Sequence, residues 1–153
     1  MPANIEFRFK SPNDSPGYLL GQLTMLWQRK IKKVLDPLDL TQTQFVLLAA
    51  VAWLSKASDA VTQMDIANQS NADRMMVSKV LRTLEEKNFL TRQEHETDTR
   101  AKTIRLTTSG GKVLQKALSQ VEQVDLEFFG ALDTKLSSFN KNMVQLINKN
   151  NNE

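Results

Sequence analysis

Cysteine is absent from the 153 residues, and histidine occurs only once, at His95. The chain therefore has no disulfide, no thiolate-based zinc site and no thiol that senses oxidants. Glycine is scarce, at five residues, and no glycine-rich phosphate-binding loop is present. Without a nucleophile and base pair or a set of metal ligands, we expect neither an enzyme nor a bound cofactor or metal.

Long hydrophobic runs are also absent. The longest, residues 45–54, is about half of the roughly 20 residues that a membrane-spanning helix needs. The first ten residues, MPANIEFRFK, lack the apolar region of a signal peptide. We therefore expect a cytoplasmic protein without a membrane partner. Lysine and arginine exceed aspartate and glutamate by 20 to 17, which gives a mild preference for polyanionic partners.

Apolar residues recur at a spacing of three to four along most of the chain, which predicts helices. The predicted helices cover residues 15–36, 41–54, 62–70 and 73–88, and two more begin near Thr107 or Thr108 and near Asp133. Thr41 with Gln44, and Thr62 with Asp65, have the spacing of helix-capping pairs. Residues 45–54 are apolar nearly all round, so this helix should lie at the centre of the domain. The Asn-rich end, residues 148–153, should fray.

Two predicted helices, 62–70 and 73–88, are separated by a tight turn, which is the outline of a helix-turn-helix. Two short β-like segments follow at 89–93 and 102–106, with polar residues between them. Helix-turn-helix followed by hairpin is the order of a winged helix. The predicted fold class is therefore mainly α with one small β-hairpin wing.

The outer face of the predicted recognition helix carries polar and cationic residues that suit DNA. They are Arg74, Met75, Ser78, Lys79 and Arg82. Arginine and lysine can donate to guanine or to phosphates, and serine can reach bases or backbone. An ordinary solvated helix face would look similar, and residues 71–105 hold only eight basic against six acidic residues. Both interpretations stay open from this pattern alone.

The hairpin tip places Asp98 two residues before Arg100. In one interpretation Asp98 orients the Arg100 guanidinium into a narrow minor groove. In the other, the two side chains form a local ion pair that stiffens the hairpin. Lys102, just after the hairpin tip, is a further candidate DNA contact, whereas His95 beside two glutamates is more typical of an exposed residue without a function.

The stretch DRMMVSKVLRTLEEKNFLTRQEHETDTRAKTIRLTTSG resembles the core signature of the MarR (multiple antibiotic resistance regulator) family. The resemblance implies a dimeric regulator of transcription, more often a repressor. It also implies that recognition helices enter successive major grooves while Asp98 and Arg100 reach the minor groove. Asn88 stands where the family often has glycine, and Thr99 stands where a second arginine is common.

Apolar stripes flank the predicted DNA-binding lobe on both sides in sequence. We expect residues 1–153 to form one MarR-like domain, with dimerisation helices at 15–36 and 108–148. The winged helix-turn-helix lobe would span 41–106, divided into a helix-turn-helix (62–88) and a wing (89–106). Burial of the stripes across a two-fold axis predicts a homodimer on a pseudo-palindromic DNA site. An intramolecular helix bundle is the alternative.

Aromatic residues Trp27, Phe45 and Trp53 are candidates for a ligand pocket, because the resemblance implies release of DNA by a small aromatic or anionic effector. The same rings could instead belong to the core. The predicted partners are therefore double-stranded DNA, a second copy of the chain and such an effector. A winged helix that binds proteins and not DNA is the alternative function.

Overall fold

The computed structural model describes residues 2–94 and 102–151. The helices are α1 (Pro16–Leu35), α2 (Gln42–Leu54), α3 (Gln63–Ser70), α4 (Arg74–Glu86), α5 (Thr108–Phe129) and α6 (Leu136–Asn150). Short 3-10 helices lie at Pro12–Asp14, Asp36–Leu38 and Gly130–Lys135. The strands β1 (Leu90–Glu94) and β2 (Lys102–Leu106) pair as an antiparallel hairpin. The predicted mainly α fold with a hairpin is thus confirmed.

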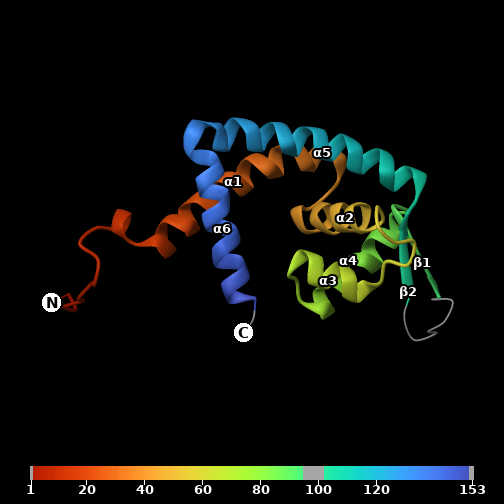
Figure 1. The fold of residues 1–153 in the computed structure, drawn as a ribbon, viewed down its shortest axis with the longest axis horizontal. Helices are drawn as coiled ribbons and strands as arrows, with labels where there is room; N and C mark the ends of the chain where they lie inside the picture. The colour runs from red at the N-terminus through yellow and green to blue at the C-terminus, as the bar shows by residue number, and fades with distance from the viewer. Residues whose placement is uncertain (1, 95–101, 152–153) are drawn as a thin grey trace.

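Two long helices, α1 and α5, lie side by side above a lobe that contains α2, α3, α4 and the hairpin (Figure 1). At the far end of α5 the chain turns back and α6 descends from it. The long helices leave the lobe in the same direction, so they carry the chain away from the region of the helix-turn-helix. Within the described residues, no helix is long and apolar enough to cross a membrane.

Local capping fixes where the helices of the lobe begin. Thr41 Oγ1 accepts a hydrogen bond from Gln44 N at 3.1 Å, and Gln44 Oε1 accepts one from Thr41 N at 3.1 Å. Thr62 and Asp65 form the same reciprocal pair at the start of α3. Asp73 caps α4 by accepting from Met76 N at 3.1 Å. The predicted caps are confirmed, because each depends on residues only three positions apart.

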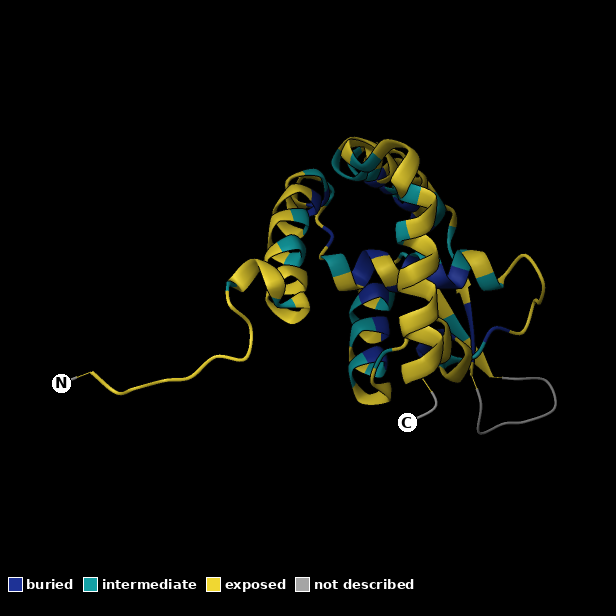
Figure 2. Cartoon of the chain, turned by 60° about the vertical axis from the view of Figure 1, so that its left-hand side comes forward, coloured by how far each residue is buried: buried dark blue, intermediate teal, exposed yellow. Residues whose placement is uncertain are grey.

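The core lies where α2 meets α3, α4, the hairpin and α5 (Figure 2). Leu47, Leu48 and Val51 of α2 are fully buried. The residues that surround them from the other elements are Ile31, Leu35, Ile66, Val77, Leu81, Leu84, Leu90, Ile104, Leu114 and Ala117. The predicted central position of α2 is thus confirmed, although Val46 and Trp53 on its outer side are 38% and 60% exposed.

The hairpin is attached to the lobe at its base. Leu90 faces Leu106 across the two strands, and Glu94 faces Lys102. Ile104 N also donates to Val61 O at 2.8 Å, so β2 pairs briefly with the segment that leads into α3. The hairpin is therefore aligned with the helix-turn-helix by backbone hydrogen bonds on both sides of β2.

A close backbone approach joins the end of α4 to the start of α5. Asn88 has a left-handed φ of 66°, which turns the chain after α4. Thr107 N then donates to Phe89 O at 3.1 Å, and Thr107 Oγ1 donates to Asn88 O at 2.7 Å. Gly110, in the first turn of α5, lies so close that a Cβ there would be 1.8 Å from Phe89 O. Only glycine fits this contact.

Two predictions for the C-terminal region are wrong. Asp133 does not cap α6: it lies in the preceding 3-10 segment with a φ of 50°, where the chain bends back, and α6 begins at Leu136 without a side-chain cap. The chain also stays helical to Asn150, past the point where fraying was expected. Asn150 Nδ2 also donates to Leu146 O at 2.7 Å, within the last turn of the helix.

Substitution of Gly110 by alanine should destabilise the fold, because the new methyl group would overlap the Phe89 carbonyl. We expect the free energy of unfolding to fall by about 2–3 kcal/mol, as for overpacking at a rigid site. Gly111→Ala is the matched control, since a methyl group there would meet no atom within 4 Å, and helix propensity predicts no loss. Urea denaturation of both variants measures the difference; equal stability would contradict the close contact.

Candidate DNA-binding interface

The tight turn between α3 and α4 sets the direction of the second helix. Asn71 takes the left-handed conformation with a φ of 52°, and Ala72 N donates to Ala67 O at 3.0 Å. Asp73 then caps the new helix. The turn contains residues that tolerate left-handed geometry or cap a helix, and this is why the chain makes a helix-turn-helix here.

Helix α4 has one buried face and one face open to solvent. Val77, Leu81 and Leu84 are completely buried against the core. The opposite side carries the predicted contact residues, of which Arg74, Lys79 and Arg82 are exposed, Ser78 is half-buried and Met75 is 82% exposed. The core thus holds α4 from behind and presents the predicted residues together on one face.

The cations on this face are not engaged by the parts of the chain that the structure describes. The side chains of Arg74, Lys79 and Arg82 form no hydrogen bond or ion pair with residues 2–94 or 102–151. Arg74, Ser78 and Arg82 follow one another at steps of four, so they lie in a row along the helix. The guanidinium and ammonium groups on this face can therefore bind DNA phosphates or the edges of guanine bases.

Other cations near α4 have structural roles that the sequence did not reveal. Lys87 Nζ donates to the backbone oxygen of Asp39 at 2.5 Å and to Gln44 Oε1 at 3.2 Å, and lies 3.4 Å from the Asp39 carboxylate. These contacts tie the end of α4 to the start of α2. Their partners lie more than 40 residues away, so no local signal could have identified them.

The wing is connected directly to the recognition helix. Arg92 on β1 donates through Nε and Nη2 to Glu85 Oε1 of α4, at 3.3 and 3.1 Å. The Arg92 side chain is only 18% exposed, so this ion pair is partly shielded from solvent. It fixes the hairpin relative to the outer face of α4.

The predicted residues of the wing are only partly placed. Lys102 is exposed at the beginning of β2, opposite Glu94. Asp98, Arg100 and His95 lie outside the described residues. In the parts of the chain with defined positions, no group of three potential metal ligands comes together.

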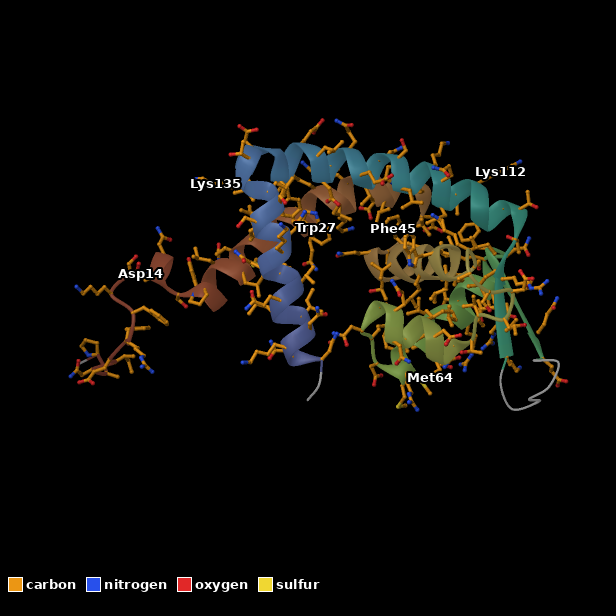
Figure 3. All side chains as sticks on the ribbon, in the orientation of Figure 1. Asp14, Trp27, Phe45, Met64, Lys112 and Lys135 are labelled. Atoms are coloured by element: carbon orange, nitrogen blue, oxygen red, sulfur yellow. The ribbon has the colours of Figure 1, made fainter. Side chains whose placement is uncertain are left out.

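The three aromatic residues predicted for a ligand pocket lie in two different places. Trp27 on α1 donates from Nε1 to Asp125 Oδ1 on α5 at 2.8 Å, which joins the two long helices (Figure 3). Phe45 and Trp53 on α2 instead line one groove of about 490 Å³ against α5, together with Lys56. Lys56 Nζ lies 4.6 Å from the centre of the Trp53 ring.

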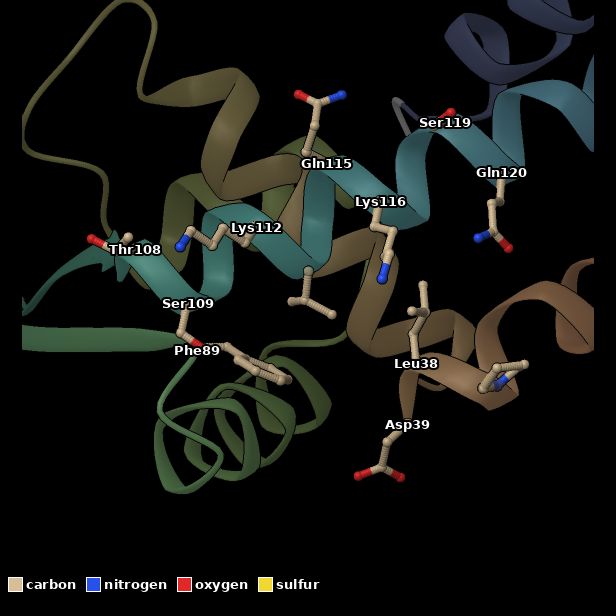
Figure 4. A pocket seen from close by; sticks show the side chains of 12 residues that line it. Leu38, Asp39, Phe89, Thr108, Ser109, Lys112, Gln115, Lys116, Ser119 and Gln120 are labelled. Carbon is tan, nitrogen blue, oxygen red and sulfur yellow. The ribbon is translucent and has the colours of Figure 1, made fainter.

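A second groove was not anticipated from the sequence. It has a volume of about 1320 Å³ and runs along the first half of α5, facing Leu38 of the α1–α2 connection and Phe89 (Figure 4). Lys112 and Lys116 of α5 supply its cations. Its walls come from three separate parts of the chain, so sequence spacing alone gives no sign of it.

A helix-turn-helix followed by an attached hairpin, with exposed cations on the outer face of the second helix, defines a winged helix-turn-helix DNA-binding protein. The MarR family profile matches residues 40–102. The uncharacterized HTH-type transcriptional regulator YdcH of Bacillus subtilis (strain 168) is 44% identical over 124 residues, which cover 81% of this chain and 84% of YdcH. The chain therefore belongs to the MarR family; it is a DNA-binding transcription regulator and not an enzyme.

Solved structures with the same fold include regulators bound to DNA. The DNA complex of MepR from S. aureus has a TM-score of 0.80 at 26% identity and covers 88% of this chain and 98% of MepR. BpsR of Bordetella bronchiseptica, whose DNA binding is regulated by 6-hydroxynicotinic acid, has a TM-score of 0.78 at 20% identity. That match covers 94% of this chain and 97% of BpsR.

The Arg92–Glu85 ion pair should couple the wing to α4 energetically. We expect Arg92→Gln and Glu85→Gln each to lower the free energy of unfolding. The double variant should lose less than the sum of the two single losses, and the difference, the coupling energy, should be about 0.5–1 kcal/mol after solvent screening. Chemical denaturation of the two single variants and the double variant measures this coupling. Strict additivity would show that this ion pair does not couple the wing to α4.

Proposed function

We propose that this protein represses transcription as a homodimer bound to a pseudo-palindromic operator. The observation that carries the proposal is the group of exposed cations on the outer face of α4, Arg74, Lys79 and Arg82, which make no ion pair with a described residue, supported by an attached wing. The α4 helices would enter successive major grooves about one helical turn apart. In this proposal the protein acts in the cytoplasm.

The proposed contacts divide according to their place on the lobe. Arg74, Met75 and Ser78, near the start of α4, would face base edges, because the first turns of a recognition helix enter the groove most deeply. Lys79, Arg82 and Lys102 would bind phosphates. Asp98 and Arg100 would reach the minor groove from the tip of the wing, as the family resemblance implies.

Exposed apolar side chains away from the lobe support the homodimer. Helix α6 buries none of its residues, and its Val144, Leu146 and Ile147 side chains are 52–63% exposed. On α1, Leu20 and Leu26 are 64% and 50% exposed. An apolar surface of this extent is typical of a protein interface. We propose that residues 15–36 and 108–148 bury it against a second copy, while 41–106 contact DNA.

We also propose that a small aromatic or anionic effector releases the protein from DNA. The groove between α2 and α5 offers Phe45 and Trp53 for an aromatic ring and Lys56 for an anion. Trp27 would contribute indirectly, through its hydrogen bond to Asp125 on α5. The regulation of BpsR by an aromatic acid supports this class of ligand.

Affinities of α4 variants for operator and random DNA should distinguish residues that contact bases from residues that contact phosphates. Arg82→Ala should weaken binding to operator and random DNA alike, by about tenfold, and lower the salt dependence by about two counterions per dimer. Arg74→Ala should weaken operator binding more than random binding, since it would remove a base contact. Fluorescence anisotropy across a salt series gives both quantities.

Lys30→Ala is the matched control for these variants, because it removes one exposed cation from α1 and none from the lobe. It should leave affinity nearly unchanged. If Arg74→Ala and Arg82→Ala behave like this control, α4 does not bind DNA, and the winged helix would serve a protein partner instead.

The effector proposal predicts a direct optical signal. In a Trp27→Phe variant, Trp53 is the remaining tryptophan, and aromatic carboxylates that bind beside it should quench its fluorescence and release operator DNA at the same concentrations. Lys56→Ala should weaken both effects by about tenfold, through loss of a charge-assisted contact. Release of DNA without any change at Trp53 would place the effector elsewhere.

A further inference from the structure

The N-terminal segment before the first 3-10 helix forms an exposed arm. Residues 2–10 are all exposed, and they make no hydrogen bond or ion pair with any part of the chain that the structure describes. In Figure 1 the arm extends away from α1, on the side opposite the hairpin. Within one copy, Phe7 and Phe9 line only a surface pocket of about 410 Å³ that they share with Tyr18, so the arm is weakly packed there.

The arm has the alternating pattern of an extended chain with one apolar face. Ile5, Phe7 and Phe9 are 64%, 83% and 48% exposed. Charged residues stand between and after the phenylalanines, with Arg8 at the centre and Lys10 at the end. Residues 8–10 form bends in the single chain. When this segment is extended, its side chains alternate, which puts the rings on one side and the cations on the other. Such a segment suits a groove with an apolar floor and an acidic rim.

A groove of that chemistry lies between α5 and α6. It has a volume of about 480 Å³, and its apolar lining consists of Leu126, Phe129, Leu136 and Met143. Glu122 and Asp125 of α5 lie on its border. Asp125 already accepts the Trp27 indole hydrogen bond, whereas Glu122 is exposed and forms no ion pair with a described residue.

The lengths of the arm and the groove agree. Seven residues of α6 separate Leu136 from Met143, which corresponds to about 10 Å along the helix axis. An extended chain covers this distance with about three residues. In extended form, the segment Phe7-Arg8-Phe9 is therefore long enough to span the groove, with two rings available for its floor and one cation for its edge.

We propose that the N-terminal arm of each protomer crosses to a second copy of the chain and docks in the groove between α5 and α6 of that copy, with Phe7 and Phe9 in the groove and Arg8 paired with Glu122. This inference rests on the proposed homodimer. The arm leads through the 3-10 helix at Pro12–Asp14 into α1, and the groove borders α6, so both adjoin the surfaces assigned to the dimer interface. Two-fold symmetry makes the contact reciprocal, with two arms and two grooves in each dimer.

A charge-reversal experiment tests the pairing. Arg8→Glu and Glu122→Arg should each raise the dimer dissociation constant by about tenfold, because each places like charges together at both copies of the contact. The double variant should recover most of the lost affinity. Arg105→Glu is the matched control: it makes the same charge change on the hairpin, far from α6, and should leave dimerisation unchanged. Sedimentation equilibrium of the full-length chain measures each constant.

The outcomes distinguish failure of the arm proposal from failure of the proposed homodimer. If the unsubstituted chain stays monomeric at all concentrations, the homodimer fails and the arm proposal fails with it. If the chain dimerises but is indifferent to both reversals, or if the double variant does not recover, only the arm proposal is overturned.

Disulfide trapping tests whether the arm crosses between copies. The chain has no cysteine, so introduced thiols are the sole sites of reaction. Phe7→Cys and Met143→Cys, carried on separately tagged copies and mixed, should form a mixed disulfide dimer, since that bond needs Cβ atoms about 4 Å apart. A double variant that instead closes a bridge within one chain, or a mixture that dimerises without bridging, would overturn the proposal.

Discussion

The close approach of α5 to the backbone at Phe89 joins the DNA-binding lobe to the long helices. Gly110 leaves room for the Phe89 carbonyl, and Thr107 hydrogen-bonds to the residues on either side of the Asn88–Phe89 peptide. Asn88 supplies the left-handed turn that brings this segment out of α4. The recognition helix, the hairpin and α5 thus meet at a single rigid joint, and the direction of α5 fixes where the outer half of the molecule lies.

Charge counting gives a poor picture of this lobe, because residues of the same sign have different roles. Lys87 and Arg92 hold α4 against its neighbours, and Glu85 is taken up by the ion pair with the wing. Asp73 accepts a backbone hydrogen bond as a cap. The outer face of α4 carries Arg74, Lys79 and Arg82, so the position of these cations, and not the surplus of two charges over residues 71–105, is what suits DNA.

Much of the fold could be predicted from the sequence because its signals are local. Helix starts at Thr41, Thr62 and Asp73 depend on contacts three residues away, and the buried stripe of α4 depends on helical period. The outward residues of α4 followed from the same period. The ion pair between Arg92 and Glu85 is close in sequence, yet neither residue carries a mark that distinguishes it from its neighbours.

Features that depend on distant parts of the chain could not be predicted. Trp27 and Asp125 are 98 positions apart, and the three grooves that border α5 have walls from separate segments. The start of α6 was misplaced because the signal of a capping Asp133 competes with the need to reverse the chain there.

Helix α5 is continuous from Thr108, beside the contact with Phe89, to Phe129. A rotation at one end of the helix therefore moves the other end. Its 22 residues span about 33 Å. A rotation of about 10° at either end therefore displaces the other end by about 6 Å, roughly a sixth of the 34 Å or so between neighbouring half-sites. A small angular change in the packing along α5 is thereby magnified into a mismatch with the spacing of the DNA grooves.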